Sequence, residues 1–263
     1  MLGQFAMHSP APGRDILHLE GLEVRFGDIQ VLHNVSLTLQ YGELRFLVGP
    51  PGAGKSTLLH VISGKVKPSQ GRALFKDAID LTKQQEAQIV QLGIGRKSQT
   101  PSAFSTLTVF ENLALSLKQQ RGLLSALWTK MTSEQRDRLH RMLALIGLQS
   151  KAKERAGSLS HAEMQWLEIG MLLMQEPELL LLDEPTAGMT ESEADRTGEL
   201  LHAINAEQTI LVAERDIAFV RRFAGTVTVL REGKLLREGA VHELLNDDKA
   251  AEMFLGRKAE RGA

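Results

Sequence analysis

Nine consecutive residues near position 50 have the types and spacing of a phosphate-binding loop. The run Gly49-Pro50-Pro51-Gly52-Ala53-Gly54-Lys55-Ser56-Thr57 fits the pattern G-x-x-x-x-G-K-[ST]. Gly52 and Gly54 allow the backbone to approach phosphate oxygens at places where a Cβ would collide. Lys55 brings positive charge to the β- and γ-phosphates, and the Ser56 hydroxyl is a ligand for Mg²⁺. The run therefore predicts binding of a nucleoside triphosphate with Mg²⁺.

A second chemical signal is a pair of acids that ends an apolar run. The residues Leu179-Leu180-Leu181-Leu182 are followed by Asp183 and Glu184. If the run is a strand that ends near the phosphate loop, Asp183 can hold Mg²⁺ through water. Glu184 can then polarise an attacking water molecule. Taken alone, the pattern also fits a buried strand with solvated acids, but its occurrence together with the loop favours phosphoryl-transfer chemistry.

The elements around these motifs must bring them together. Period-two or continuous apolar patterns predict strands, and helical spacing of apolar residues predicts helices, with Ser133 as an N-cap and Gly147 after the same helix. The predicted strands cover 17–20, 35–39, 44–48, 71–75, 179–182, 209–212 and 226–230, and the predicted helices cover 56–63, 83–92, 109–115, 133–146, 191–205 and 217–223. Strands alternating with helices indicate an α/β sheet, which a mostly helical middle interrupts.

Composition narrows the class of protein. The 263 residues are 43% hydrophobic, which is enough for a substantial core, and the formal net charge of −1 gives no reason to expect a nucleic-acid partner. The chain has no Cys, so thiol chemistry and disulfides are excluded. No stretch approaches the ~20 apolar residues of a membrane span. Residues 1–14 do not fit a secretory signal and are expected to be a flexible tail.

With these motifs in order, the chain from about 16 to 257 resembles the ATPase subunits of ABC transporters. Five segments resemble the family's Walker A, Q-loop, signature, Walker B and H-loop motifs: 49–57, 95–101 with Gln99, 159–163, 182–185 and 214–216. The resemblance implies an α/β P-loop NTPase fold with a mixed sheet core. It also implies a single domain over 15–263, with a helical subdomain inserted at about 104–175.

The resemblance also implies roles for individual residues. Phe26 would stack on adenine, although a core position on a strand is the alternative for this side chain. Glu184 and Arg215 would be catalytic, and Ser56, Gln99 and Asp183 would surround Mg²⁺. The residues implied in binding ATP are Phe26, the loop residues 49–57, Gln99, and the signature residues Ser160, His161, Ala162 and Glu163.

Finer sequence detail is similar to the branched-chain amino acid type of importer, and most similar to ATPase subunits of urea importers. The segments that carry this similarity are 93–97, 165–173, 187–190 and 254–257. The implied partners are a second ATPase subunit, identical or paralogous, two membrane permease subunits and, indirectly, a periplasmic substrate-binding protein. The implied location is the cytoplasmic face of the inner membrane. The transported substrate is not encoded in a subunit that never contacts it.

Four positions depart from the family pattern. Pro51 removes one N–H group from the phosphate cradle. Ala162 and Glu163 replace residues of the signature, and Glu163 places a negative charge near a polyanion unless its side chain points away. Arg215 stands where the family has a histidine, and it cannot accept a hydrogen bond. Two interpretations are open for Arg215: a cation that stabilises transition-state charge, or a surface arginine that no longer has the role of the histidine.

These departures leave alternatives to an ATP-hydrolysing importer subunit. The first alternative is a regulatory subunit that binds nucleotide but hydrolyses it weakly or not at all. The second is a small-molecule kinase, suggested by the phosphate loop alone, but a kinase would not need the Asp183-Glu184 strand or a signature. Among the departures, we expect Arg215 rather than Pro51 to limit turnover.

Overall fold

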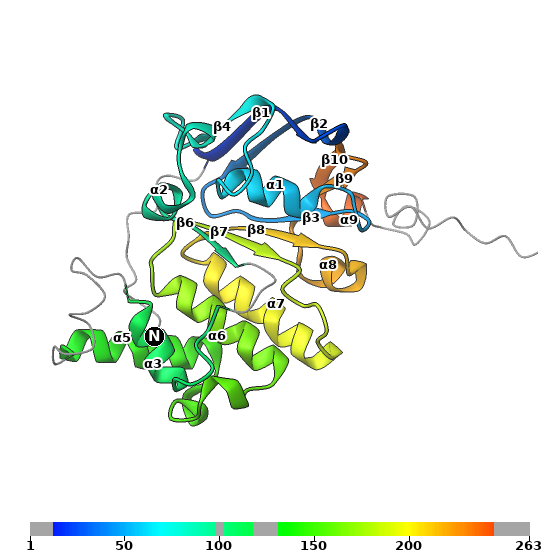
Figure 1. Cartoon of the computed structure of the whole chain (residues 1–263). Coiled ribbons are helices and arrows are strands. Elements are labelled where there is room, and N and C mark those ends of the chain that lie inside the picture. The colour runs from blue at the N-terminus through cyan, green and yellow to red at the C-terminus, as the bar shows by residue number, and fades with distance from the viewer. Residues whose placement is uncertain (1–12, 98–101, 118–130, 245–263) are drawn as a thin grey trace, which may run out of the picture.

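The computed structural model describes residues 13–97, 102–117 and 131–244, which form two β-sheets with helices between and beside them (Figure 1). The larger sheet is mixed, because every neighbouring pair is parallel except β10 with β9. Its spatial order is β10 (Lys234–Ala240), β9 (Thr226–Arg231), β3 (Leu44–Val48), β8 (Thr209–Glu214), β7 (Leu179–Asp183) and β6 (Ile94–Lys97).

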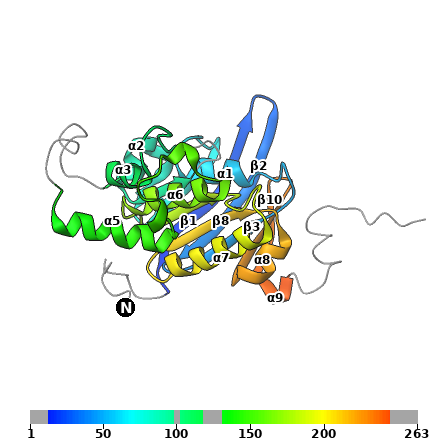
Figure 2. The ribbon, with the colours of Figure 1, turned by 90° about the horizontal axis from the view of Figure 1, so that it is seen from below.

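The smaller sheet is antiparallel and lies above the mixed sheet in Figure 1. Its order is β2 (Ile29–Gln40), β1 (Asp15–Phe26), β4 (Gln70–Phe75) and β5 (Ile79–Asp80). The hairpin of β1 and β2 projects from the body of the molecule (Figure 2).

Helix α1 (Lys55–Ile62) lies between the two sheets, whereas α5, α6 and α7 cover the opposite face of the mixed sheet (Figures 1 and 2). The other helices of the described residues are α2 (Glu86–Gln91), α3 (Val109–Leu115), α5 (Ser133–Ile146), α6 (His161–Leu173), α7 (Glu191–Asn205), α8 (Ile217–Phe223) and α9 (Val241–Leu244). Short 3₁₀ turns lie at Leu81–Lys83, Gln149–Lys151 and Ala156–Ser158. None of the helices in the described part of the chain is long and apolar enough to cross a membrane. Since α3, α5 and α6 fall between β6 and β7 in the sequence, we propose that 104–175 is a helical insertion within a single domain over 15–263.

The core explains why the leucine run before Asp183 has no polar member. Leu179 and Leu181 of β7 pack with α1 and the antiparallel sheet. Leu180 and Leu182 pack with the helices on the other face. A strand that is covered on both faces needs apolar side chains at successive positions, since neighbouring residues point to opposite faces.

The predicted α/β class and mixed sheet are confirmed, and most predicted elements occur where the patterns placed them. The helix predicted over 83–92 was too long: α2 starts at Glu86, after a separate 3₁₀ turn. Ser133 was wrong as the N-cap of α5, because the Thr132 side chain accepts the hydrogen bond from the Gln135 N–H instead. Gly147 ends this helix in the left-handed conformation, as its position predicted.

Candidate active site

The phosphate loop connects the end of β3 to the start of α1 near the carboxyl edge of the parallel strands. Its last residue before the helix, Gly54, has φ of 102° and no side chain, so nothing caps the N-terminus of α1. A Cβ on Gly49 would lie 2.0 Å from the Leu230 carbonyl oxygen of β9, so only glycine fits there. The loop therefore presents backbone N–H groups at a helix start, an arrangement suited to an anion.

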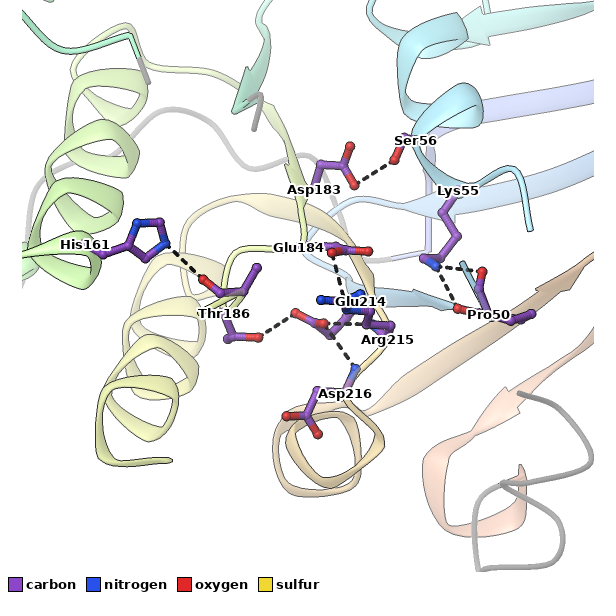
Figure 3. A network of polar contacts seen from close by, with 12 residues as sticks. Pro50, Lys55, Ser56, His161, Asp183, Glu184, Thr186, Glu214, Arg215 and Asp216 are labelled. Carbon is purple, nitrogen blue, oxygen red and sulfur yellow. Dashed lines mark hydrogen bonds and ion pairs between the residues drawn. The ribbon is translucent and has the colours of Figure 1, made fainter. Parts of the chain in front are cut away.

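Lys55 is buried within the curve of this loop. Its Nζ donates to the carbonyl oxygens of Gly49, at 2.7 Å, and Pro50, at 3.2 Å (Figure 3). An ammonium has three N–H groups, so the two carbonyls leave one for a phosphate oxygen. Burial lowers the pKa of Lys55 from its ordinary value, while the neighbouring carboxylates, Glu184 first, act in the opposite direction.

Ser56 and Asp183 meet across the site, although one belongs to α1 and the other to the end of β7. The Ser56 hydroxyl donates to Asp183 Oδ1 at 3.1 Å (Figure 3). A hydroxyl and a carboxylate are hard oxygen ligands that suit Mg²⁺, which usually completes its shell with water and substrate phosphates. Residues 13–97, 102–117 and 131–244 contain no cluster of three or more His, Cys, Asp or Glu residues that could hold a metal ion.

Glu184 and Arg215 form an ion pair at the same edge of the sheet. The Glu184 N–H donates to the Ala213 carbonyl oxygen at 2.9 Å, and its φ of 47° turns the chain sharply after β7. Arg215 Nε lies 3.5 Å from Glu184 Oε2, and the side chains are 54% and 19% exposed. The cation is thus more accessible to solvent than the acid it pairs with.

Glu214, for which no role was predicted from the sequence, holds two loops of the site together. Its buried carboxylate accepts the Thr186 hydroxyl at 2.7 Å through Oε2. Oε1 accepts the backbone N–H groups of Arg215, at 2.7 Å, and Asp216, at 3.2 Å (Figure 3). Burial raises the pKa of Glu214, although these hydrogen bonds act in the opposite direction. The sequence contained a signal for Glu214, because this acid ends the apolar strand β8 just as Asp183 ends β7.

The signature segment forms the start of α6. Ser160 is the N-cap, and its N–H donates to Glu163 Oε2 at 3.0 Å, while the Glu163 N–H donates to Ser160 Oγ at 3.3 Å. Lys151 Nζ lies 2.8 Å from Glu163 Oε1. Burial alone would raise the pKa of Glu163, but the bonds from Lys151 and Ser160 hold it below its ordinary value. The Glu163 side chain is therefore occupied within its own subunit.

The other two signature residues face in different directions. Ala162 is buried in the core under α6, so its methyl group does not lie on the exposed face of the helix start. His161 is exposed, and with a proton on Nε2 it donates to the Ala187 carbonyl oxygen at 3.0 Å (Figure 3). This contact joins the signature to the loop that follows Glu184.

The other residues predicted to bind ATP are Phe26, the remaining residues of the phosphate loop, and Gln99. Phe26 is 51% exposed at the end of β1, so the alternative of a core phenylalanine is wrong. Pro51 and Gly52 are exposed and Ala53 is buried, while Pro50 and Thr57 are partly exposed. Gln99 lies outside the described residues.

Comparisons with known proteins identify the family that the chain resembles. Residues 32–187 match the family model described as ABC transporter. The high-affinity branched-chain amino acid transport ATP-binding protein LivG of Escherichia coli K12 is 33% identical over 250 residues, covering 92% of this chain and 98% of the relative. A probable LivG of Methanocaldococcus jannaschii is 31% identical over 252 residues, with the same shares covered.

Two solved structures are similar over most of the chain. One is an ATP-binding cassette of an ABC transporter in its ADP conformation, with a TM-score of 0.80 and 29% identity, covering 92% of this chain and 99% of the other. The second is a dimeric cassette in a post-hydrolysis state bound to ADP and Pi. It has a TM-score of 0.73 and 26% identity, with 86% of this chain and 98% of that chain covered.

Proposed function

The chain belongs to the ABC transporter family, and on this premise we propose that it hydrolyses ATP to power an importer for urea, a related small amide or branched-chain amino acids. Its ATPase domain is homologous to ATP-hydrolysing transporter subunits. The observation that carries the proposal is the contact of Ser56 with Asp183 beside the phosphate loop. This pair of oxygen donors would serve a Mg²⁺ ion bound with the triphosphate in the loop.

The side chains divide the work of hydrolysis among them. The N-terminus of α1 and Lys55 hold the phosphates. Ser56 and Asp183, with Gln99, would hold Mg²⁺, which would supply positive charge against the phosphate oxygens. Glu184 would accept a hydrogen bond from the attacking water and so orient that water. Arg215 lies beside Glu184, and its N–H groups would stabilise the negative charge that develops on the γ-phosphate.

The chain is proposed to act as one half of a head-to-tail dimer of ATPase subunits, identical or paralogous. In such a dimer, the loop around Lys55 holds ATP on one side and the signature residues Ser160, His161, Ala162 and Glu163 of the other subunit close over it. Phe26 has the exposure that adenine stacking requires. Two permease subunits would bind the dimer at the cytoplasmic face of the inner membrane, and a periplasmic binding protein would deliver the substrate to them.

A regulatory subunit with weak hydrolysis remains a second candidate, favoured by one observation. Arg215 is paired with the carboxylate that is expected to orient water. The signature departures argue less for this candidate, because Ala162 is buried and the charge of Glu163 is compensated by Lys151.

Reconstitution of the ATPase pair with its permeases separates these candidates. MgATP affinity by calorimetry and steady-state hydrolysis in proteoliposomes are measured for the wild type and Lys55→Ala. An importer ATPase binds MgATP, hydrolyses it faster when substrate and binding protein are present, and loses binding in Lys55→Ala because the phosphates lose their counter-charge. Binding without stimulated hydrolysis would support the regulatory subunit. Competition between labelled urea and leucine for uptake identifies the substrate.

A further inference from the structure

Glu168, to which the sequence analysis assigned no role, is buried about two turns into helix α6 and pairs with a buried lysine. Its Oε2 lies 3.3 Å from Lys97 Nζ, and the side chains are 2% and 4% exposed. Lys97 is the last residue of β6. The pair therefore joins the end of an edge strand of the mixed sheet to the helix that begins with the signature.

The second oxygen of Glu168 has its own partners. Oε1 accepts the backbone N–H of Ser102 and also its hydroxyl, the latter at 3.3 Å. Lys97 and Ser102 lie on either side of 98–101 in the sequence, so one carboxylate fixes the chain both before and after this segment. One ion pair and two hydrogen bonds from two separate places thus converge on a single side chain of α6.

The strand end held by Glu168 is next to the proposed metal site. β6 is parallel to β7, and Lys97 stands opposite Leu182, the residue before Asp183. At the other end, α6 starts at the Ser160 N-cap, two turns before Glu168. The Asp183 edge of the sheet and α6 are therefore joined by a polar contact as well as by packing.

Packing alone does not require charges at these positions. Leu167 and Ile169, the neighbours of Glu168, lie in the apolar cluster that contains Leu182. Replacing a buried ion pair by apolar residues of similar volume often leaves stability unchanged or raises it. An ion pair with directed hydrogen bonds instead restricts the two elements that it joins to one relative position.

We propose that Glu168 is a positioning residue, which through Lys97 and Ser102 couples the triphosphate side of the site to the signature end of α6. The inference rests on the proposed function, since it concerns how one subunit's bound ATP prepares its signature for the partner subunit. It assigns to Glu168 no contact with ATP or Mg²⁺.

The test uses the full chain with Glu184→Gln as the parent, in which ATP is held and not hydrolysed. The variant Lys97→Met with Glu168→Gln removes both buried charges and leaves an amide oxygen to accept from Ser102. The matched control is Lys76→Met with Glu178→Gln, which removes a partly buried ion pair just before β7, at the opposite end of that strand. Calorimetry gives the Kd for MgATP, light scattering gives the ATP concentration for half-maximal dimerisation, and thermal unfolding gives Tm.

We expect the Lys97/Glu168 variant to keep the MgATP Kd of the monomer within about threefold while dimerisation needs roughly tenfold more ATP, the size of a typical coupling between sites. The control should change neither. An unchanged dimerisation curve, with or without a lower Tm, would overturn the inference by reducing Glu168 to a structural role. If the parent itself failed to bind ATP or dimerise, the proposed function would fall instead.

A charge-swapped variant protects the test against misfolding. Lys97→Glu with Glu168→Lys keeps two opposite charges but exchanges their positions. This variant folds if the site accepts an ion pair with the acid on β6 and the base on α6. The carboxylate then no longer lies on α6 to accept from Ser102. Restored folding with dimerisation still shifted supports positioning by Glu168, whereas full restoration of dimerisation overturns it.

Discussion

The Nε atom of Arg215 lies 3.5 Å from Oε2 of Glu184, so the acid proposed to orient the attacking water has a permanent cation as its neighbour. Arginine stays charged at all physiological pH values and has only donors. An arginine paired with a carboxylate competes with water for one of the carboxylate oxygens. In the proposed function the same cation would also donate to the γ-phosphate, so Arg215 would act on both the water and the phosphate.

Replacing Arg215 by histidine should raise kcat in the assembled transporter and change nucleotide affinity little. A histidine can sit neutral near pH 7 and donate from one nitrogen while the other is held, so Glu184 becomes available to water. Correcting a misplacement of ~1 Å is worth up to roughly 10²-fold in rate, and several-fold to tenfold is expected here. Pro51→Asn, which restores one N–H to an exposed position of the loop, should do less. A lower kcat for Arg215→His would identify Arg215 as a required cation.

Neutralising Glu184 should separate binding from hydrolysis. Glu184→Gln keeps the shape of the side chain but cannot act as a base, so we expect an unchanged MgATP Kd and a loss in kcat of about 10²- to 10⁴-fold. Dimers formed with ATP should also dissociate more slowly. Steady-state phosphate release and light scattering measure the two effects. Hydrolysis at the wild-type rate would exclude Glu184 as the catalytic carboxylate.

Removing the carboxylate of Glu214 should disturb both catalytic loops without touching ATP. Glu214→Ala leaves the Thr186 hydroxyl and two backbone N–H groups without their buried acceptor, which costs about 2–4 kcal/mol of unfolding free energy and lowers kcat. Glu214→Gln can still accept the two N–H groups and should restore most of both quantities. Denaturant unfolding and kcat are measured side by side. Loss of stability in Glu214→Ala with an unaltered kcat would show that Glu214 does not position the two loops for catalysis.

The contact of Glu163 with Lys151 should make stability depend on pH at acid values. The pKa of folded Glu163 is below its ordinary value of 4.5, so the stability it contributes is present above pH 4.5 and is lost as the pH falls through the folded pKa. Glu163→Gln keeps the capping geometry and loses the charge. We expect it to be less stable than the wild type by about 0.5–1 kcal/mol at pH 7 and equal to it at the acid end.

Urea unfolding at several pH values between 7 and 3.5 checks this prediction. Lys151→Met is the matching change on the other side of the pair and should show the same pH dependence, because it removes the same interaction. A Glu163→Gln difference that stayed constant down to pH 3.5 would mean that the capping hydrogen bonds, and not the charge, provide the stability.

The sequence by itself determined the chemistry and most of the local structure. Gly49 to Thr57 fits only a narrow class of loops, and α3, α7 and α8 begin and end where the apolar spacing predicted. These features depend on short-range physics: capping, helical periodicity and the conformational freedom of glycine act within a few residues. The strand before Asp183 could also be predicted from the sequence, because a strand buried on both faces has only apolar residues before its final acid.

The tertiary structure decided which side chains face one another. The sequence left open whether the Glu163 side chain points toward a phosphate or away from it. In the structure α6 packs beside Lys151, and the ion pair with Lys151 fixes the direction of this side chain. Arg215 and Glu184 come from the ends of neighbouring strands, and Glu168 reaches Lys97 from another element altogether. Such contacts depend on sheet register and helix packing between residues 12 to 71 positions apart, which no local pattern encodes because the side-chain direction is set by the whole core.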